Sequence, residues 1–130
     1  MSSEKRIYGK DDATTVAELR QKVDQFVAER EWNQFHSPKN LSMAIAAEAA
    51  ELMELFMWVE GKDSRVEAER KRQDVEDELA DVMIACLCFA SSCGIQVSEA
   101  IERKLAKTCE KYPVDKVRGR SDKYTEYANK

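Results

Sequence analysis

Two acidic pairs with the same spacing stand inside the two most apolar stretches of this chain. Glu48 and Glu51 lie in one stretch, Glu78 and Asp81 lie in the other, and the members of each pair are three residues apart. Residues three apart on an α-helix are neighbours, so each pair presents two carboxylates side by side. Two like charges about 4 Å apart repel by roughly 4 kcal/mol at an effective dielectric near 20, so packing both pairs together requires compensation.

The compensation can be protonation of the acids, pairing with Lys or Arg, or binding of a metal ion. No Lys or Arg occurs between residues 41 and 59 or between residues 75 and 92, so a basic partner must come from another segment. Metal binding is the most economical explanation, because ligand sets made only of oxygen suit hard cations such as Mg²⁺. The plainer alternative is that the acids lie on solvated helix faces.

A helical periodicity of about 100° per residue places one acid of each pair within an apolar stripe. The stripe around Glu48 consists of Leu41, Ile45, Leu52, Leu55 and Val59. The stripe around Glu78 consists of Val75, Val82, Ala85 and Phe89. We therefore expect Glu48 and Glu78 to face the core and Glu51 and Asp81 to lie at its edge.

Capping signals predict the helices that position these acids. The expected helices cover about 15–30, 37–61, 64–93 and 98–111. Capping boxes are formed by Thr15 with Glu18 and by Ser64 with Glu67, while Ser37 before Pro38 and the later Ser98 are further N-caps. The expected helix ends are marked by Gly61, Gly94 and Pro113.

Four helices with short connections predict an all-α, antiparallel four-helix-bundle-like fold in a single domain of residues 1–130. Segments 1–13 and 114–130 are expected to be irregular tails. A composition of 43% hydrophobic and 35% charged residues suits a helical protein. Apolar residues also occur off the main stripes, among them Met53, Met57 and Met83, so we expect a second subunit to cover part of the surface.

Composition and charge disfavour several classes of function. The net charge of −4 argues against a general nucleic-acid binder. No apolar run is long enough to span a membrane and the first residues lack a signal-peptide core, so we expect a cytoplasmic, or alternatively nuclear, protein without a membrane partner. The four cysteines show no C-x-x-C spacing, which predicts reduced, buried thiols.

Carboxylate-rich helical bundles have two main enzymatic interpretations. Di-iron bundles use E-x-x-H motifs, but the one histidine of this chain, His36, lies in no such motif. An acidic Mg²⁺ site therefore fits better, and it predicts a phosphate-bearing substrate. Basic residues that can meet the phosphates are Lys104, Lys107, Lys111, Arg118, Arg120 and Lys123, although each is also an ordinary surface residue. Trp32, Phe35, His36 and Trp58 can stack a base or simply fill the core.

The acidic pattern, with 26 residues between Glu51 and Glu78, resembles the signature of the all-α nucleoside triphosphate pyrophosphatases, the MazG-like superfamily. Further runs are similar to its dCTP pyrophosphatase branch from about Phe26 to Tyr127. These runs are REWNQFHSPKNL, EAAELMELFMW, EDELADV, KYP and KYTEY.

This resemblance implies hydrolysis of a deoxynucleoside triphosphate, by preference dCTP or a modified dCTP, to the monophosphate and pyrophosphate. It implies that Glu48, Glu51, Glu78 and Asp81 are catalytic Mg²⁺ ligands, with one glutamate helping to deprotonate the attacking water. The positions that match the nucleoside pocket are Trp32, Asn33, Gln34, Phe35, His36 and Trp58. Those that match the phosphate side are Lys104, Lys111 and Tyr112. The resemblance also suggests a tetramer, with a dimer as the alternative.

The chain departs from the family pattern at Val23, Ala85 and Thr108, where a His, a Tyr and an Asn are expected. These departures leave the base and sugar preference open. Two other classes of function remain alternatives: a non-catalytic helical module that binds a cation or a basic partner, and a nucleotide-binding regulator that does not hydrolyse its ligand.

Overall fold

The computed structural model describes residues 4–121, and the regular elements among them are all helical, as predicted. The chain forms two compact units, Met1–Ile95 and Gln96–Lys130. The first unit contains the 3₁₀-helices η1 (Gly9–Asp12), η2 (Trp32–Phe35) and η3 (Gly61–Asp63) and the α-helices α1 (Val16–Glu29), α2 (Pro38–Glu54), α3 (Ser64–Arg70) and α4 (Arg72–Cys93). The second unit contains α5 (Val97–Lys111) and α6 (Val114–Val117).

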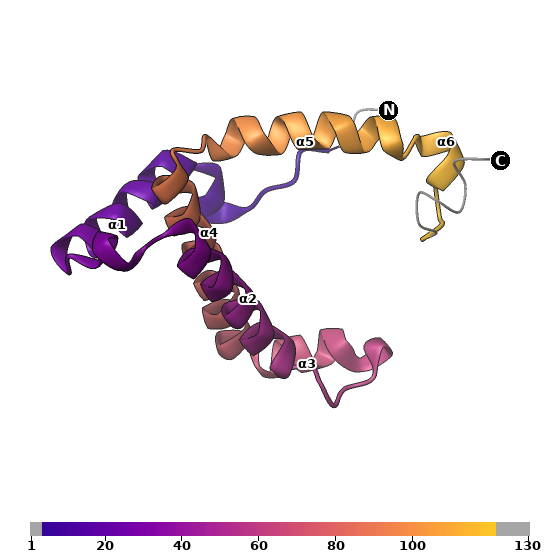
Figure 1. Cartoon of the computed structure of the whole chain (residues 1–130). Helices are drawn as coiled ribbons and strands as arrows, with labels where there is room; N and C mark the ends of the chain where they lie inside the picture. The colour runs from indigo at the N-terminus through magenta and orange to yellow at the C-terminus, as the bar shows by residue number, and fades with distance from the viewer. Residues whose placement is uncertain (1–3, 122–130) are drawn as a thin grey trace. The chain divides into compact units, whose positions relative to one another are not determined.

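The main packing in the first unit is between α2 and α4. The chain leaves α2, turns through α3 and returns along α2 as α4, so the two helices are antiparallel (Figure 1). α1 also packs against α4. The buried core is centred on Val27, Leu41 and Cys88, one from each of these helices, with Val23 and Phe89 packed against it. Because α5 belongs to the second unit, the four-helix bundle stays a prediction.

The N-terminal caps predicted for α1 and α2 are confirmed. Thr15 Oγ1 accepts a hydrogen bond from the Glu18 backbone N–H at 3.1 Å, and the Glu18 carboxylate accepts one from the Thr15 N–H at 3.2 Å. The hydroxyl of Ser37 accepts a hydrogen bond from the Asn40 N–H at 3.2 Å, with Pro38 in the first turn. These caps satisfy N–H groups that the helices leave unpaired.

The predicted end of α2 at Gly61 is wrong, because the helix ends at Glu54 and residues 55–58 form turns. The backbone N–H groups of Leu55 and Phe56 bond to carbonyls three residues back, at 3.3 and 3.0 Å. The Leu55 carbonyl oxygen accepts a hydrogen bond from Lys71 Nζ at 3.3 Å. The side chain of Lys71, 16 residues further along the chain, therefore donates a hydrogen bond to a backbone carbonyl just after the end of α2.

The predicted third helix over 64–93 is also corrected, because it is broken at Lys71 into α3 and α4. The expected capping box does not form. Ser64 lies inside α3 and its hydroxyl donates to the Gly61 carbonyl at 2.7 Å, while the Glu67 carboxylate pairs with Arg70 and Lys71. Hydrogen bonds from Arg70 and then Lys71 lower the pKa of Glu67 to about 2.

The later helix ends agree better with the sequence. Gly94 ends α4 at a φ of 64°, a left-handed conformation that glycine adopts without strain, as predicted. α5 ends at Lys111 before Pro113, but it begins at Val97 with Gln96 as N-cap, so the predicted cap at Ser98 is wrong. The single turns η1 and α6 lie within the segments expected to be irregular, and residues 122–130, including Lys123, lie outside the described range.

All four cysteines are free, as predicted, but the prediction that they are buried is wrong for Cys86, Cys93 and Cys109, which are exposed. Within residues 4–121 no single helix has both the length and the apolar character needed to cross a membrane, and only α4 and α5 combined, as a bent pair, meet that test by length and composition.

Candidate active site

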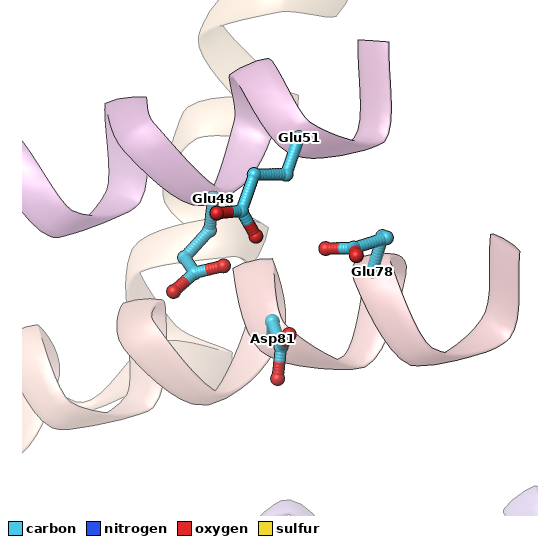
Figure 2. Close-up of side chains that lie close together, drawn as sticks. All are labelled: Glu48, Glu51, Glu78 and Asp81. Carbon is cyan, nitrogen blue, oxygen red and sulfur yellow. The ribbon is translucent and has the colours of Figure 1, made fainter. Parts of the chain in front are cut away.

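The two acidic pairs meet between α2 and α4. Glu48 and Glu51 project from α2, Glu78 and Asp81 project from α4, and the pairs lie on facing turns (Figure 2). Each side chain offers one carboxylate oxygen, and these four oxygens all lie within 4.8 Å of one another. The sequence prediction that both pairs come together is therefore confirmed by the geometry.

Burial within this acidic cluster follows the predicted stripes. Glu48 and Glu78 are half-buried, whereas Glu51 and Asp81 are exposed. Their apolar neighbours on the stripes, such as Leu41 on α2, are buried or half-buried. Because the antiparallel helices bury these stripes against each other, one acid of each pair is drawn into the interface while the other stays at its edge.

The acidic cluster lacks internal compensation for its charge. Burial, followed by the charge of Glu51, raises the pKa of Glu48. Burial also raises the pKa of Glu78, with further contributions from a hydrogen bond to Glu51 and from its charge. The ion pairs of residues 4–95 involve the carboxylates of Glu29, Glu67, Glu69 and Glu76, and none involves this cluster.

Two buried carboxylate oxygens of the acidic cluster are available to bind a cation. Glu48 Oε2 and Glu78 Oε2 are buried and have no hydrogen-bond partner. Buried polar atoms normally have one, and an oxygen that lacks it is a natural ligand for a cation. Four convergent carboxylates with two unsatisfied oxygens therefore fit a hard divalent metal ion.

A pocket of about 220 Å³ opens directly beside the acids. Glu48 and Asp81 form part of its wall, and the predicted residues Trp32 and His36 line it as well. The remaining lining residues are Phe26, Val27, Leu41, Ala44, Ile84, Ala85 and Cys88. The ring of Phe26 meets that of Trp32 edge to face, with centroids 5.5 Å apart. The wall thus combines carboxylates with aromatic and small apolar side chains.

The other residues predicted for the nucleoside pocket do not line this pocket. Asn33 lines a second, larger cavity of about 510 Å³. Gln34 Nε2 donates to the Glu31 carbonyl at 2.9 Å, and Phe35 is 60% exposed. Trp58, 92% exposed, lies in the turns after α2. Their contact with a nucleoside stays a prediction.

The residues predicted for the phosphate side belong to the second unit. Lys104 and Lys111 lie on α5 and Tyr112 caps its end. Thr108, one of the departures from the family pattern, donates its hydroxyl hydrogen bond to the Lys104 carbonyl at 2.9 Å. Roles for Lys104, Lys111 and Tyr112 in binding phosphate stay predictions.

Sequence reasoning missed several residues of the two cavities. Phe26 and Ile84 line the pocket beside the acids, and Asp24, Ser91 and Ser92 line the larger cavity. The only signal was indirect: Asp24 lies between core-facing Val23 and Val27 on α1, where a charged side chain falls near the buried face.

Known proteins resemble this chain in sequence and in structure. The model of the MazG-like family matches residues 43–127. The dCTP pyrophosphatases 1 of Mus musculus and Homo sapiens are each 35% identical over 114 residues, which make up 86% of this chain and 67% of theirs. The crystal structure of a pyrophosphatase from Archaeoglobus fulgidus superposes with a TM-score of 0.72 at 33% identity, over 86% of this chain and 99% of that one.

The family match includes all four acids of the cluster, and the relatives extend the likeness to most of the chain. The chain therefore belongs to the MazG-like family.

Proposed function

We propose that this chain, a nucleoside triphosphate pyrophosphohydrolase by family and relatives, hydrolyses a deoxynucleoside triphosphate to the monophosphate and pyrophosphate. The proposed substrate is dCTP or a base-modified dCTP, and the proposed metal ion is Mg²⁺. The family and the relatives named dCTP pyrophosphatase 1 support this substrate class.

The acidic cluster is the observation that carries the proposal. Four carboxylate oxygens within 4.8 Å of one another, with two buried and unsatisfied, suit a hard cation better than any other ligand. A bound Mg²⁺ would polarise the phosphate oxygens and offset the charge that develops during hydrolysis. One of the cluster's carboxylates accepts the proton that the attacking water loses.

The pocket beside the acids supplies a place for the nucleoside. Trp32 is 43% exposed, so its indole face can stack on a base, an interaction worth roughly 1–3 kcal/mol. His36 lines the same pocket, and Glu48 and Asp81 connect it to the acidic cluster. We propose that the triphosphate points toward the acids and that Lys104, Lys111 and Tyr112 of the second unit bind its phosphates.

The exposed apolar surface of α2 and α4 supports a homo-oligomer. Met53, Leu79 and Met83 are 59%, 47% and 57% exposed, and Trp58 in the turns after α2 is 92% exposed. Large apolar side chains exposed along neighbouring helices are typical of an interaction surface. We propose that further copies of the chain cover it, with a tetramer favoured over a dimer.

The function is tested by measuring release of pyrophosphate and of orthophosphate from each dNTP, from NTPs and from base-modified dCTPs, with and without Mg²⁺. We expect Mg²⁺-dependent pyrophosphate release, strongest with dCTP or a modified dCTP. Glu48→Gln should abolish it, whereas Glu54→Gln, an exposed glutamate of the same helix, should not. Orthophosphate without pyrophosphate, or metal-dependent melting without turnover on any nucleotide, would refute the proposal and favour a binding module.

A further inference from the structure

The larger cavity adjoins the pocket beside the acids. Its volume is about 510 Å³, and Val27, His36 and Cys88 line both spaces. Glu48 and Asp81 belong only to the smaller pocket, and Asp24 belongs only to the larger cavity. The two spaces are therefore adjoining compartments that share part of their wall, with the acidic cluster beside the smaller one and Asp24 on the wall of the larger one.

The wall of the larger cavity is held together by long-range hydrogen bonds. Ser92 Oγ donates to the His36 carbonyl at 2.8 Å, which joins the segment after η2 to the end of α4. Arg20 of α1 donates to the Ile95 carbonyl at 2.6 Å and contacts Ser91 Oγ at 3.5 Å. All the elements that form the cavity are thus tied to one another, and a ligand entering it meets a preorganised wall.

Asp24 supplies an uncommitted acceptor to this wall. Within residues 4–121, no Lys, Arg or hydrogen-bond donor is paired with its carboxylate. Asp24 and Cys88 line the same cavity. Burial and, secondarily, the charge of Asp24 raise the pKa of the Cys88 thiol. An ionised carboxylate only accepts hydrogen bonds, so Asp24 favours a ligand group that donates.

The smaller compartment alone is tight for a nucleoside. Its volume of about 220 Å³ is below the usual range for small-molecule pockets, about 300–1,000 Å³, whereas the neighbouring cavity lies within that range. A nucleoside whose base stacks on Trp32 and whose phosphates lie at the acids therefore needs space beyond this compartment, and the adjoining larger cavity, with Asp24 on its wall, offers that space.

We propose that Asp24 is a specificity-determining residue, which accepts a hydrogen bond from the exocyclic amino group of a pyrimidine and so selects amino-bearing over keto-bearing bases. The inference rests on the proposed function and deepens it. Cytosine presents an amino donor at position 4, whereas thymine and uracil present an oxygen acceptor there. A carboxylate attracts the first and repels the second.

The test compares dCTP with dUTP, which differ at position 4 of the base. Hydrogen bonds to charged groups correspond to about 10- to 100-fold in affinity. We expect Asp24→Asn to lower the dCTP/dUTP ratio of kcat/KM by at least about tenfold, because the carboxamide can donate to the uracil oxygen. Glu29→Gln, at an exposed glutamate on the same helix, should keep the wild-type ratio. An unchanged ratio in Asp24→Asn overturns the inference.

Binding of dCMP and dUMP, measured by calorimetry in EDTA, separates this inference from the proposed function. Loss of a dCMP preference in Asp24→Asn supports the role of Asp24 even if no triphosphate is hydrolysed, in which case only the proposed function fails. Pyrophosphate release from dCTP with equal dCMP preference in wild type and Asp24→Asn leaves the function standing and refutes the role of Asp24.

Discussion

Lys71 Nζ lies 3.3 Å from the carbonyl oxygen of Leu55 and 3.0 Å from Glu67 Oε1. These contacts join the end of α2 to the point where α4 begins. Glu51 lies one helical turn before Leu55, and Glu78 lies two turns after Lys71. The ammonium group of Lys71 therefore fixes the two acid-bearing helices to each other close to the acidic cluster.

Replacing Lys71 by Met should loosen this connection. The Leu55 carbonyl and the half-buried Glu67 lose a donor, so we expect Lys71→Met to lower the free energy of unfolding by about 1 kcal/mol. Denaturation in urea measures the change, with Lys62→Met, at an exposed lysine of η3, as control. Equal midpoints for the two variants would show that the contact contributes nothing to stability.

Neutralising one acid of the cluster should have opposite effects on stability and activity. Glu51 raises the pKa of both Glu48 and Glu78, so Glu51→Gln relieves repulsion in the metal-free protein. We expect its melting temperature in EDTA to rise by a few degrees, while pyrophosphate release falls by more than about 100-fold. Glu54→Gln should change neither quantity, and a less stable Glu51→Gln protein would contradict the repulsion.

The metal-free protein should lose stability as the pH rises above about 4.5. Glu48 and Glu78 have raised pKa values in the folded state, so in this range the native protein binds more protons than the unfolded chain. The free energy of unfolding contributed by these groups therefore falls with increasing pH. Urea denaturation in EDTA at several pH values should show a flatter profile for the double variant Glu48→Gln and Glu78→Gln. Identical slopes would count against this interpretation.

At lower pH, Glu67 should make the free energy of unfolding rise with increasing pH, the opposite of the effect of Glu48 and Glu78. Its pKa is lowered from 4.5 to about 2, so its contribution to stability is complete above pH 4.5 and is lost as the pH falls toward 2. Glu67→Gln should therefore remove part of the acid-induced destabilisation below pH 4.5. Circular dichroism during acid titration measures it, with Glu69→Gln, an exposed glutamate of α3, as control.

Mg²⁺ should stabilise the protein more strongly at higher pH. Glu48 and Glu78 must lose any bound proton before they bind the ion. We therefore expect a lower dissociation constant for Mg²⁺ at pH 8 than at pH 6. A concentration 100 times the dissociation constant adds about 2.7 kcal/mol to the free energy of unfolding. Calorimetry in two buffers with different ionisation enthalpies counts the released protons. A pH-independent dissociation constant would exclude this coupling.

Hydrophobic periodicity predicted the acidic site better than the capping signals predicted the helix ends. The positions of Glu48 and Glu78 within apolar stripes correctly predicted that these two acids face the core. The reason is that the packing of α2 on α4 follows the hydrophobic pattern. Just after the early end of α2 at Glu54, the Leu55 carbonyl accepts a hydrogen bond from Lys71, a contact that spans 16 residues and leaves no local signal. The capping box expected at Ser64 fails because Glu67 pairs with two basic residues instead. The larger cavity depends on α1, η2 and α4 together, and no single segment indicates it.

The break at Lys71 also affects how much length variation the chain can tolerate. In one continuous helix, each inserted residue would rotate everything after it by about 100° and turn Glu78 and Asp81 away from Glu48 and Glu51. Here α4 begins as a separate helix after Lys71. Lys71, which connects α4 to the end of α2, follows the segment 60–70 in the sequence. We therefore expect insertions or deletions in that segment that spare Glu67, the partner of Lys71, to leave the alignment of the four carboxylates undisturbed.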